Sequence, residues 1–559
     1  MFRQFYPHVV DSIGARNPQL FREVKGKLKP KNVAIVSLAS IIGQILLYLY
    51  FNNLLPTVKH RYSNRYCTAT PADSYSHFGV CQEDLLGNIM TLKELWWLDV
   101  FTTMSIMGIF ILLVVGSYML IDDICKENTR NTLNFLRLTP QSAMTILAGK
   151  MLGVPILVYL FGALALPLHF FTGLKANIPP ILIFGFYLVL GASCLFFYTA
   201  SLLFSLVSNG LGGFQAWLGS LAIFFFCLTN MGVSLEAYRW SATSFDWFAL
   251  FYPGMFLVYL VKATFLSPNT IGYLSAEGLS NLNWYGNFWW QNSWSGFALI
   301  IANYGVWTFW LWKGVKRRFH NPHEVAISKY HSYLISACFI VFNLGFTLQE
   351  NSLSGSDFKD KLIVFLIVNF FYLLLITLAL TPQRQTLLDW SRFRYENFNH
   401  RHLAKDLLLG EKSPAIGAIA LNILLINLYV TPAIVIFSWG EDKVLMLTGL
   451  ILGALMMVIY ATIYQLLLLL KTKKRNLIAT TVVSTLIIAP FWSVIITGSS
   501  GLANFWLFSP FPAVAVAEVS FLPLLVSFLT QIVVIIGFNY QLKKMLNKAG
   551  ESETKALLS

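Results

Sequence analysis

Runs of about twenty consecutive apolar residues recur along the whole length of this chain. We identify twelve, and none of them contains Asp, Glu, Lys or Arg. Each run is long enough to cross the ~30 Å hydrocarbon core of a bilayer as an α-helix. The sequence therefore predicts an all-α polytopic membrane protein with about twelve transmembrane helices. The predicted spans are 33–53, 100–121, 151–173, 181–207, 211–232, 296–312, 330–349, 362–381, 414–437, 444–470, 476–497 and 521–540.

The overall composition excludes a soluble protein. Of the 559 residues, 56% are hydrophobic and 12% are charged, whereas the charged fraction of an average soluble domain is about 25%. Lipid is therefore the expected surroundings for most of the chain.

The distribution of basic residues predicts the orientation of these spans, because Lys and Arg resist translocation. With a cytoplasmic N-terminus, the inside segments hold 30 of the 40 Lys and Arg residues and the outside segments hold 10. We therefore expect both termini in the cytoplasm. The net charge of +14 then reflects a positive-inside protein that favours anionic lipid headgroups, not a nucleic-acid binder. No cleavable signal peptide is visible, and we expect a bacterial plasma (inner) membrane location.

Two of the six cysteines lie in the first predicted outside loop, at Cys67 and Cys81. An oxidising compartment allows a disulfide between them, and two free thiols are the alternative. No Cys-x-x-Cys motif and no Cys/His cluster indicates a metal site.

The order of elements repeats along the chain. Each half begins with a basic segment containing Asn-Pro and continues through six spans, with an aromatic segment before the last one. Because both halves begin inside, the two repeats are predicted to be parallel. The predicted domains are an interfacial N-terminal segment (1–32), a first half (33–320), a second half (321–545) and a cytoplasmic tail (546–559).

A half-polar segment, NTLNFLRLTPQSAMTILAGK at 131–150, separates two of the most apolar runs. Its pattern predicts a short helix from Thr132 to Leu138 and a second helix capped by Thr139 with Pro140 at its first position. Leu133 and Leu136 are three residues apart, so they share a face of the first helix. That face is expected either to contact a partner protein or to lie on lipid headgroups.

These residues resemble the segment between the second and third spans of type-2 ABC transporter permeases. In that family an acidic residue, a Thr-Leu pair, an apolar triplet, Thr-Pro or Ser-Pro, and a later Gly-Lys recur, and the segment docks into the ATPase subunit as a coupling helix. The matching residues here are Glu127, Thr132, Leu133, Phe135, Leu136, Thr139, Pro140, Gly149 and Lys150. An interfacial helix at about 17–31 and a half-inserted outside helix in FYPGMFLVYLVKATFL agree with the same plan.

The equivalent segment of the second half, at 382–413, departs from this pattern. It resembles the matching region of large cyanobacterial-type permeases of the class, with GEKSP at 410–414. Leu387, Leu388 and Trp390 are its candidate docking residues. The resemblance thus implies a fused, two-half permease with unequal contacts to its ATPase.

The chain carries no G-x-x-x-x-G-K-[ST] motif, whose glycines and lysine would cradle the phosphates of ATP. The resemblance therefore implies that ATP and Mg²⁺ bind a separate ATPase, in two copies per chain, and that this chain has no cofactor or enzymatic activity of its own. A lipid-like, amphiphilic or hydrophobic substrate suits its many aromatic residues, which make up 15% of the chain.

Two other function classes are compatible with particular residues. An ion-coupled secondary transporter needs an ionisable residue at membrane depth, and His169 is the candidate. An integral-membrane enzyme such as a prenyltransferase would use Asp122, Asp123 and Glu127 to hold Mg²⁺; the alternative is that these acids pair with neighbouring basic residues.

Polar residues inside the spans are candidates for a transport pathway. Interhelical hydrogen bonding is the alternative role for each of them. They are Asn303, Asn369, Asn422 and Asn427, with Ser105, Ser117 and Ser201 as weaker candidates.

Overall fold

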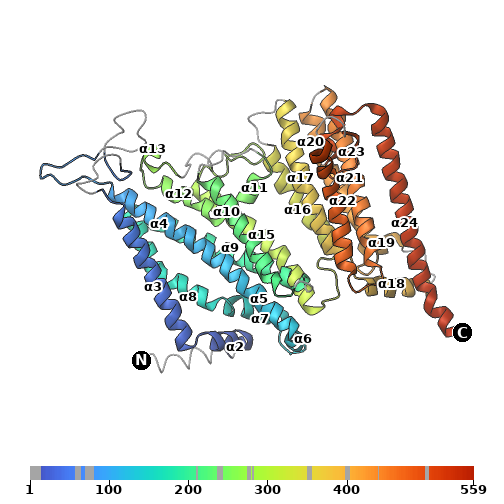
Figure 1. Cartoon of the computed structure of the whole chain (residues 1–559), viewed down its shortest axis with the longest axis horizontal. Helices are drawn as coiled ribbons and strands as arrows, with labels where there is room; N and C mark the ends of the chain where they lie inside the picture. The colour runs from blue at the N-terminus through green and yellow to red at the C-terminus, as the bar shows by residue number, and fades with distance from the viewer. Residues whose placement is uncertain are drawn as a thin grey trace. The chain divides into compact units, whose positions relative to one another are not determined.

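The computed structural model describes most of the chain, and its helices are shown in Figure 1. The described residues are 14, 16–56, 64–68, 81–208, 212–235, 243–273, 279, 282–348, 355–396, 403–438, 440–497 and 503–558. Their regular structure is helical, and their β contacts are three isolated bridges. The first part of the predicted N-terminal segment, residues 1–13, lies outside them.

The chain divides into two compact units, with the main border between His320 and Asn321. Two short segments that precede this border, Ala242–Trp247 and Asn283–Asn287, belong to the second unit. The ring of Trp247 in the first segment packs against that of Phe339 with centroids 5.7 Å apart, and the indole of Trp284 in the second donates to the Phe342 carbonyl at 3.2 Å.

Ten helices of the described residues are long and apolar enough to cross a membrane. The protein is therefore an all-α, multi-pass membrane protein by length and composition of its helices. Those of the first unit are α3 (Pro30–Asn53), the continuous run of α4 (Lys93–Phe110), the π-helix η1 (Ile111–Val115) and α5 (Gly116–Thr129), then α8 (Ile156–Lys175), α9 (Pro180–Val207) and α10 (Phe214–Ser234). Those of the second unit lie in α17 (Gly355–Leu380), α20 (Ile416–Phe437), α21 (Gly440–Leu468), α22 (Arg475–Thr497) and α24 (Phe521–Leu558).

Two of the twelve predicted spans are not among these ten helices. The runs 296–312 and 330–349 do form helices, α15 (Ser293–His320) and α16 (Lys329–Thr347), but both are less apolar than the others. Tryptophans and basic residues lower the mean hydropathy of α15, and Lys329, His331 and buried serines lower that of α16. Residue 349, at the end of one predicted span, and residue 211, at the start of another, lie outside the described residues.

Shorter helices connect the long ones. In the first unit these are α2 (Pro18–Lys27), α6 (Thr132–Arg137), α7 (Ala143–Gly153), α11 (Asp246–Ala249, whose first two residues lie in the second unit), the 3-10 helix η2 (Pro253–Phe256), α12 (Leu257–Lys262) and α13 (Pro268–Ile271). In the second unit they are α18 (Arg384–Glu396), α19 (Leu403–Leu409), α23 (Ala503–Trp506) and the 3-10 helices η5 (Pro512–Val514) and η6 (Val516–Glu518). The sequence expected for a half-inserted helix thus forms η2 and α12, and every side chain of the two except Lys262 is buried.

Each unit has its own apolar interior. In the first unit α9 packs along α15, and Tyr304 of α15 donates its hydroxyl hydrogen to the Phe251 carbonyl at 2.8 Å. In the second unit α21 packs against α20, α22 and α24, and the rings of Phe339 and Tyr372 stack with centroids 3.8 Å apart. These interiors fix the segments that connect the long helices.

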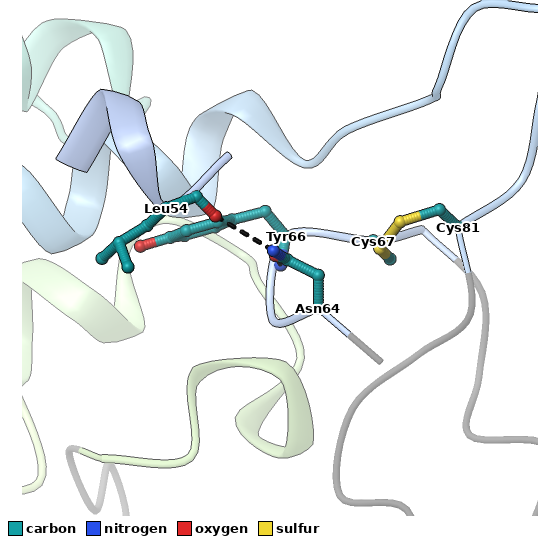
Figure 2. The surroundings of a disulfide bond; sticks show 5 residues. All are labelled: Leu54, Asn64, Tyr66, Cys67 and Cys81. Carbon is teal, nitrogen blue, oxygen red and sulfur yellow. Dashed lines mark hydrogen bonds between the residues drawn. A yellow bond between two sulfur atoms is a disulfide. The ribbon is translucent and has the colours of Figure 1, made fainter. Parts of the chain in front are cut away.

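A disulfide bond joins Cys67 to Cys81, beside the start of the first long loop (Figure 2). The loop's first residues are tied to the helices around it: Asn64 donates to the Leu54 carbonyl at 3.0 Å, and the Tyr66 hydroxyl donates to Asp99 at 2.9 Å. Residues 69–80 of the loop lie outside the described residues. The predicted bond thus closes the loop at a point where the chain is already anchored.

Candidate functional site

The segment between α5 and α7 reverses the direction of the chain and exposes a short helix. Helix α5 ends at Thr129, and Asn131 adopts a left-handed conformation with φ of 59°. Asn is among the few residues that take this conformation readily. Helix α6 follows from Thr132 to Arg137 with Leu138 as its C-cap, as the sequence pattern predicts.

The predicted start of the next helix is wrong. Thr139 and Pro140 do not begin α7, which starts at Ala143 with Ser142 as its N-cap. The Ser142 side chain accepts a hydrogen bond from the Thr145 N–H at 3.1 Å. The Thr139 hydroxyl instead donates to the Leu136 carbonyl at 2.7 Å, so Thr139 closes α6.

The expectation that Leu133 and Leu136 face outward is also wrong. Their exposed fractions are only 1% and 7%, because they pack in the first unit's own core with Ile146 and Leu147 of α7. The two leucines do share a helix face, as their spacing requires. That face holds α6 on the molecule and is not available to a partner.

The outward surface of α6 consists of other residues. Phe135 and Leu138 are 72% and 85% exposed, and Met144 at the start of α7 is 54% exposed. Asn131 and Asn134 are exposed beside them. We call these five residues the α6 tip; of them, only Phe135 was among the docking residues predicted from the sequence.

Arg137 fastens the α6 tip to the end of α15. Its Nε donates to the Phe319 carbonyl at 2.7 Å, and its Nη1 donates to Asn134 at 2.7 Å. A cation near the last carbonyls of a helix is favourable. Burial lowers the pKa of the Arg137 guanidinium, which stays charged at neutral pH.

A buried lysine at the end of the segment gathers three carboxylates. Lys150 is fully buried, and its Nζ lies 2.6 Å from Asp123, 2.9 Å from Glu127 and 3.4 Å from Glu23. Arg22 pairs with Glu127 from the edge. The acidic residue and the Gly-Lys of the sequence signature therefore meet in space, and we call this group the Lys150 cluster.

The pKa shifts in the Lys150 cluster reflect mutual stabilisation of its charges. Burial by itself lowers the pKa of Lys150, but Asp123, Glu127 and Glu23 outweigh it, so the pKa lies above its usual value. Burial raises the pKa of Glu23, and Lys150 and its other cationic neighbours more than reverse this. Both groups are therefore charged at neutral pH.

The Lys150 cluster also bears on the predicted alternative of a magnesium site. Glu23, Asp123 and Glu127 offer oxygens close enough to one another to hold a metal ion. The Lys150 ammonium already lies among these oxygens and supplies the positive charge. The other acid considered, Asp122, pairs with Lys126 at 2.6 Å, so the arrangement supports the paired-acid alternative.

Helix α2 packs directly on α7 over two glycines. Asn17 caps α2 by accepting from the Leu20 N–H at 3.0 Å, and its amide donates to the Thr145 carbonyl at 2.9 Å. A Cβ atom on Gly149 would lie 2.8 Å from Asn17, and one on Gly153 would lie 2.6 Å from Glu23. The glycine of the Gly-Lys signature is thus required for this close approach.

The corresponding segment of the second unit is built differently. Leu387 of α18 is buried in a small core with Leu469, Leu542 and Leu546, so it is not available for docking. The indole of Trp390 donates to an Asp406 carboxylate oxygen at 3.0 Å. Both Trp390 and Leu388 are half-buried, and residues 397–402 lie outside the described residues.

A second buried lysine, Lys329, fixes this segment through neutral groups. Its Nζ donates to the Leu407 carbonyl at 2.7 Å, to the Ser413 hydroxyl at 2.7 Å and to the Pro414 carbonyl at 3.0 Å. Lys329 directly precedes a predicted span. Burial lowers its pKa to about 8, although Asp406 and Glu411 act in the opposite direction.

The structure brings together only two of the four asparagines predicted to line a pathway, Asn369 and Asn427. Asn422 is fully buried and donates to Ser332 at 3.0 Å, which is an interhelical structural role. Asn369 and Asn427 line a cavity of about 40 Å³ in the second unit, which holds no more than one or two waters. Asn303 is buried on α15 in the first unit.

The predicted ion-coupling candidate is fully hydrogen bonded. His169 is buried, with Nε2 at 2.7 Å from the Ser105 hydroxyl and Nδ1 at 2.9 Å from the Tyr187 hydroxyl. Ser201 donates to the Phe197 carbonyl at 2.8 Å, and Ser117 is buried on α5. Comparison of the chain with protein-family models, with curated proteins and with solved structures finds no match.

Proposed function

We propose that this chain is the membrane-spanning permease subunit of an ABC transporter. In this proposal it moves a hydrophobic or amphiphilic substrate across a bacterial plasma membrane, with energy from a separate ATPase that binds ATP and Mg²⁺. One observation supports it best: the exposed α6 tip is held in place by the buried charges of the Lys150 cluster.

A helix of six residues has no stability of its own in water. Helix α6 is nevertheless fixed on three sides, by Leu133 and Leu136 in the core, by Arg137 on the Phe319 carbonyl, and by the Lys150 cluster at the base of its hairpin. A contact that transmits movement from one protein to another requires a helix that is held rigidly in this way.

The composition of the α6 tip favours a protein partner over lipid headgroups. Phe135 and Leu138 are flanked by Asn131 and Asn134, and the basic residue of the same helix, Arg137, is engaged with the Phe319 carbonyl. Helices that bind membrane surfaces usually present basic residues on their polar side. A mixed apolar and amide surface suits a protein interface, whose core excludes charge.

The second unit has its own segment in the corresponding chain position, so one copy of the chain offers places for two ATPase subunits. Of the residues predicted there, Leu388 and Trp390 are partly accessible, whereas Leu387 is not. We therefore expect one chain per ATPase pair, with the stronger contact at the α6 tip. Native mass spectrometry showing two copies of the chain per ATPase pair would contradict this stoichiometry.

The test of the proposal is co-purification. The tagged chain, extracted in mild detergent from its native membrane, should carry a polypeptide with a phosphate-binding loop, identified by mass spectrometry. Phe135→Asp places a charge in an apolar contact, costs a few kcal/mol, and should weaken docking about a hundredfold. Membrane insertion should be unchanged.

Leu85→Asp is the matched control, because Leu85 is fully exposed in the loop after Cys81, far along the chain from α6. It should retain the ATPase. If the wild-type chain carries no nucleotide-binding subunit, or if Phe135→Asp and wild type retain it equally, the permease proposal fails.

A further inference from the structure

The first unit contains an apolar cavity that the proposed docking role does not use. It has a volume of about 600 Å³ and lies between α3, α4 with η1, α8 and α9. Ligand sites in proteins typically occupy ~300–1,000 Å³. None of the described residues that line it is Asp, Glu, Lys or Arg.

The lining of the cavity extends over several turns of the helices around it. On α9 its lining runs from Phe186 to Tyr198, which at ~1.5 Å per residue is about 18 Å. The cavity is therefore long enough to hold one hydrocarbon chain.

Glycines from four different helices keep this space open. Gly43 (α3), Gly108 (α4), Gly162 (α8) and Gly191 (α9) all line the cavity. A Cβ atom on Gly43, Gly108 or Gly191 would meet no described atom within 4 Å, and one on Gly162 would meet only Leu112, at 3.9 Å. Each glycine costs about 1 kcal/mol of helix stability. Helix packing does not require them, and a larger side chain at any of these positions would occupy part of the open space.

The cavity wall also contains the π-helix η1. Ile111 and Leu112 of η1 line the space, and the Tyr198 hydroxyl donates to the Leu112 carbonyl at 2.6 Å. Single π-helical turns inside α-helices often mark functional sites. Here the π-turn changes the direction of the side chains that form one wall.

One polar group of the cavity has a defined hydrogen-bond polarity. The Ser105 hydroxyl donates to the Phe101 carbonyl at 2.8 Å, so it must accept from His169 Nε2–H. His169 Nδ1 then accepts from the Tyr187 hydroxyl at 2.9 Å. The Tyr187 oxygen, which lines the cavity, is left with lone pairs that can accept a hydrogen bond from a ligand.

We propose that this cavity binds one hydrocarbon chain of a neutral amphiphile, whose head group donates a hydroxyl or amide hydrogen to the Tyr187 oxygen. The absence of charged lining residues disfavours an ionised head group. The statement that this amphiphile is the transported substrate rests on the proposed function. The binding of the amphiphile does not rest on it, because the cavity lies wholly within this chain.

The inference is tested with the purified full chain, without ATPase, and a photoactivatable long-chain alcohol, hexadecanol carrying a diazirine near the middle of its chain. Peptide mapping should place the label on α3, α8 or α9. Gly108→Leu and Gly191→Leu fill the groove while raising helix propensity, and each should reduce labelling about tenfold. Tyr187→Phe should weaken binding about threefold to tenfold.

Gly305→Leu is the matched control, since Gly305 on α15 also has open space around it but does not line the cavity. It should label like wild type. A phosphatidylcholine with the same diazirine chain tests whether any bilayer lipid fills the groove. Equal labelling by both probes, unchanged by Tyr187→Phe, would overturn the head-group assignment, and labelling unaffected by both leucine variants would overturn the site. Neither of these labelling results would change the outcome expected of the co-purification test of the permease proposal.

Discussion

Two buried lysines fix the two connecting segments, and they do so by opposite means. Lys150 in the first unit lies among three carboxylates, whereas Lys329 in the second unit donates to two carbonyls and a hydroxyl. The pKa of Lys150 lies above its usual value and that of Lys329 is lowered to about 8. The same residue thus gives a charge-compensated base in one unit and, in the other, a pH-sensitive one that is held mainly by neutral acceptors.

The largest expected effect is that of Lys150→Met. It leaves Glu23, Asp123 and Glu127 without the buried cation that lies among them, and removing one partner of a buried charge group costs about 3–5 kcal/mol. Thermal unfolding in detergent should show this loss, and limited proteolysis should cut between α2 and α3 faster than in wild type.

The control is Lys126→Met, which removes an exposed pair with Asp122 and should cost less than about 1 kcal/mol. If the two variants are equally stable, the Lys150 cluster does not anchor the first unit.

Lys329→Met should cost less, about 1–3 kcal/mol, because it removes hydrogen bonds from neutral acceptors but also removes an uncompensated charge. Its effect depends on pH. The folded pKa of about 8 lies below the ordinary value of 10.5, so between these values the unfolded chain binds more protons. Stability from this group is therefore lowest below pH 8 and rises as pH increases to 10.5.

The measurement is the difference in melting temperature between wild type and Lys329→Met at pH 7 and at pH 9.5. The difference should grow in favour of wild type at the higher pH. The same comparison for Lys150→Met should show no such growth, because the raised pKa of Lys150 keeps its stabilisation until the pH rises through that value. If the melting-temperature difference changed with pH in the same way for both lysine variants, the two units would not differ in how their buried lysines are stabilised.

Asn17→Ala should cost about 1 kcal/mol, the usual value of an N-cap. It also removes the bond from Asn17 to the Thr145 carbonyl, so it loosens the start of α2 but removes no side chain of the Lys150 cluster. Hydrogen exchange of α2 amides should increase while that of α6 does not. Equal increases in both helices would mean that α2, and not the buried charges, fixes the α6 tip.

Phe135→Asp should have the smallest effect on stability, within about 0.5 kcal/mol, because Phe135 is 72% exposed. Leu136→Asp, one residue later, should be strongly destabilising because Leu136 is buried in the core. Unfolding midpoints of the two variants measure this directly, and a large loss for Phe135→Asp would mean that the tip is part of the fold.

The sequence predicted the long helices well, because a run of twenty apolar residues has few alternatives. It overestimated α15 and α16, whose aromatic and polar residues lower their hydropathy. Spacing showed correctly that Leu133 and Leu136 share a face, but periodicity does not tell whether that face meets a partner or the protein's own interior. Thr139 and Ser142 are both good caps, and their contacts distinguish them: Thr139 donates to the Leu136 carbonyl, whereas Ser142 accepts from the Thr145 N–H.

The Lys150 cluster and the cavity could not be predicted from the sequence. Glu23 and Lys150 are 127 residues apart, and no local pattern connects them. The four cavity glycines are scattered over 43–191 and look in the sequence like weak points of four helices. Their common role appears only when the helices are assembled.

The distance between Glu23 and Lys150 along the chain also sets an order of events during synthesis. At ~5–20 residues per second, Lys150 leaves the ribosome roughly 6–25 s after Glu23, since 127 residues separate them. During that interval the Glu23 carboxylate of α2 has no Lys150 ammonium with which to pair. Lys27, one helical turn after Glu23 and 3.6 Å from it in the folded chain, can hold the carboxylate until the third long helix begins to emerge. Helix α2 can therefore take its final position only after α7 has been made.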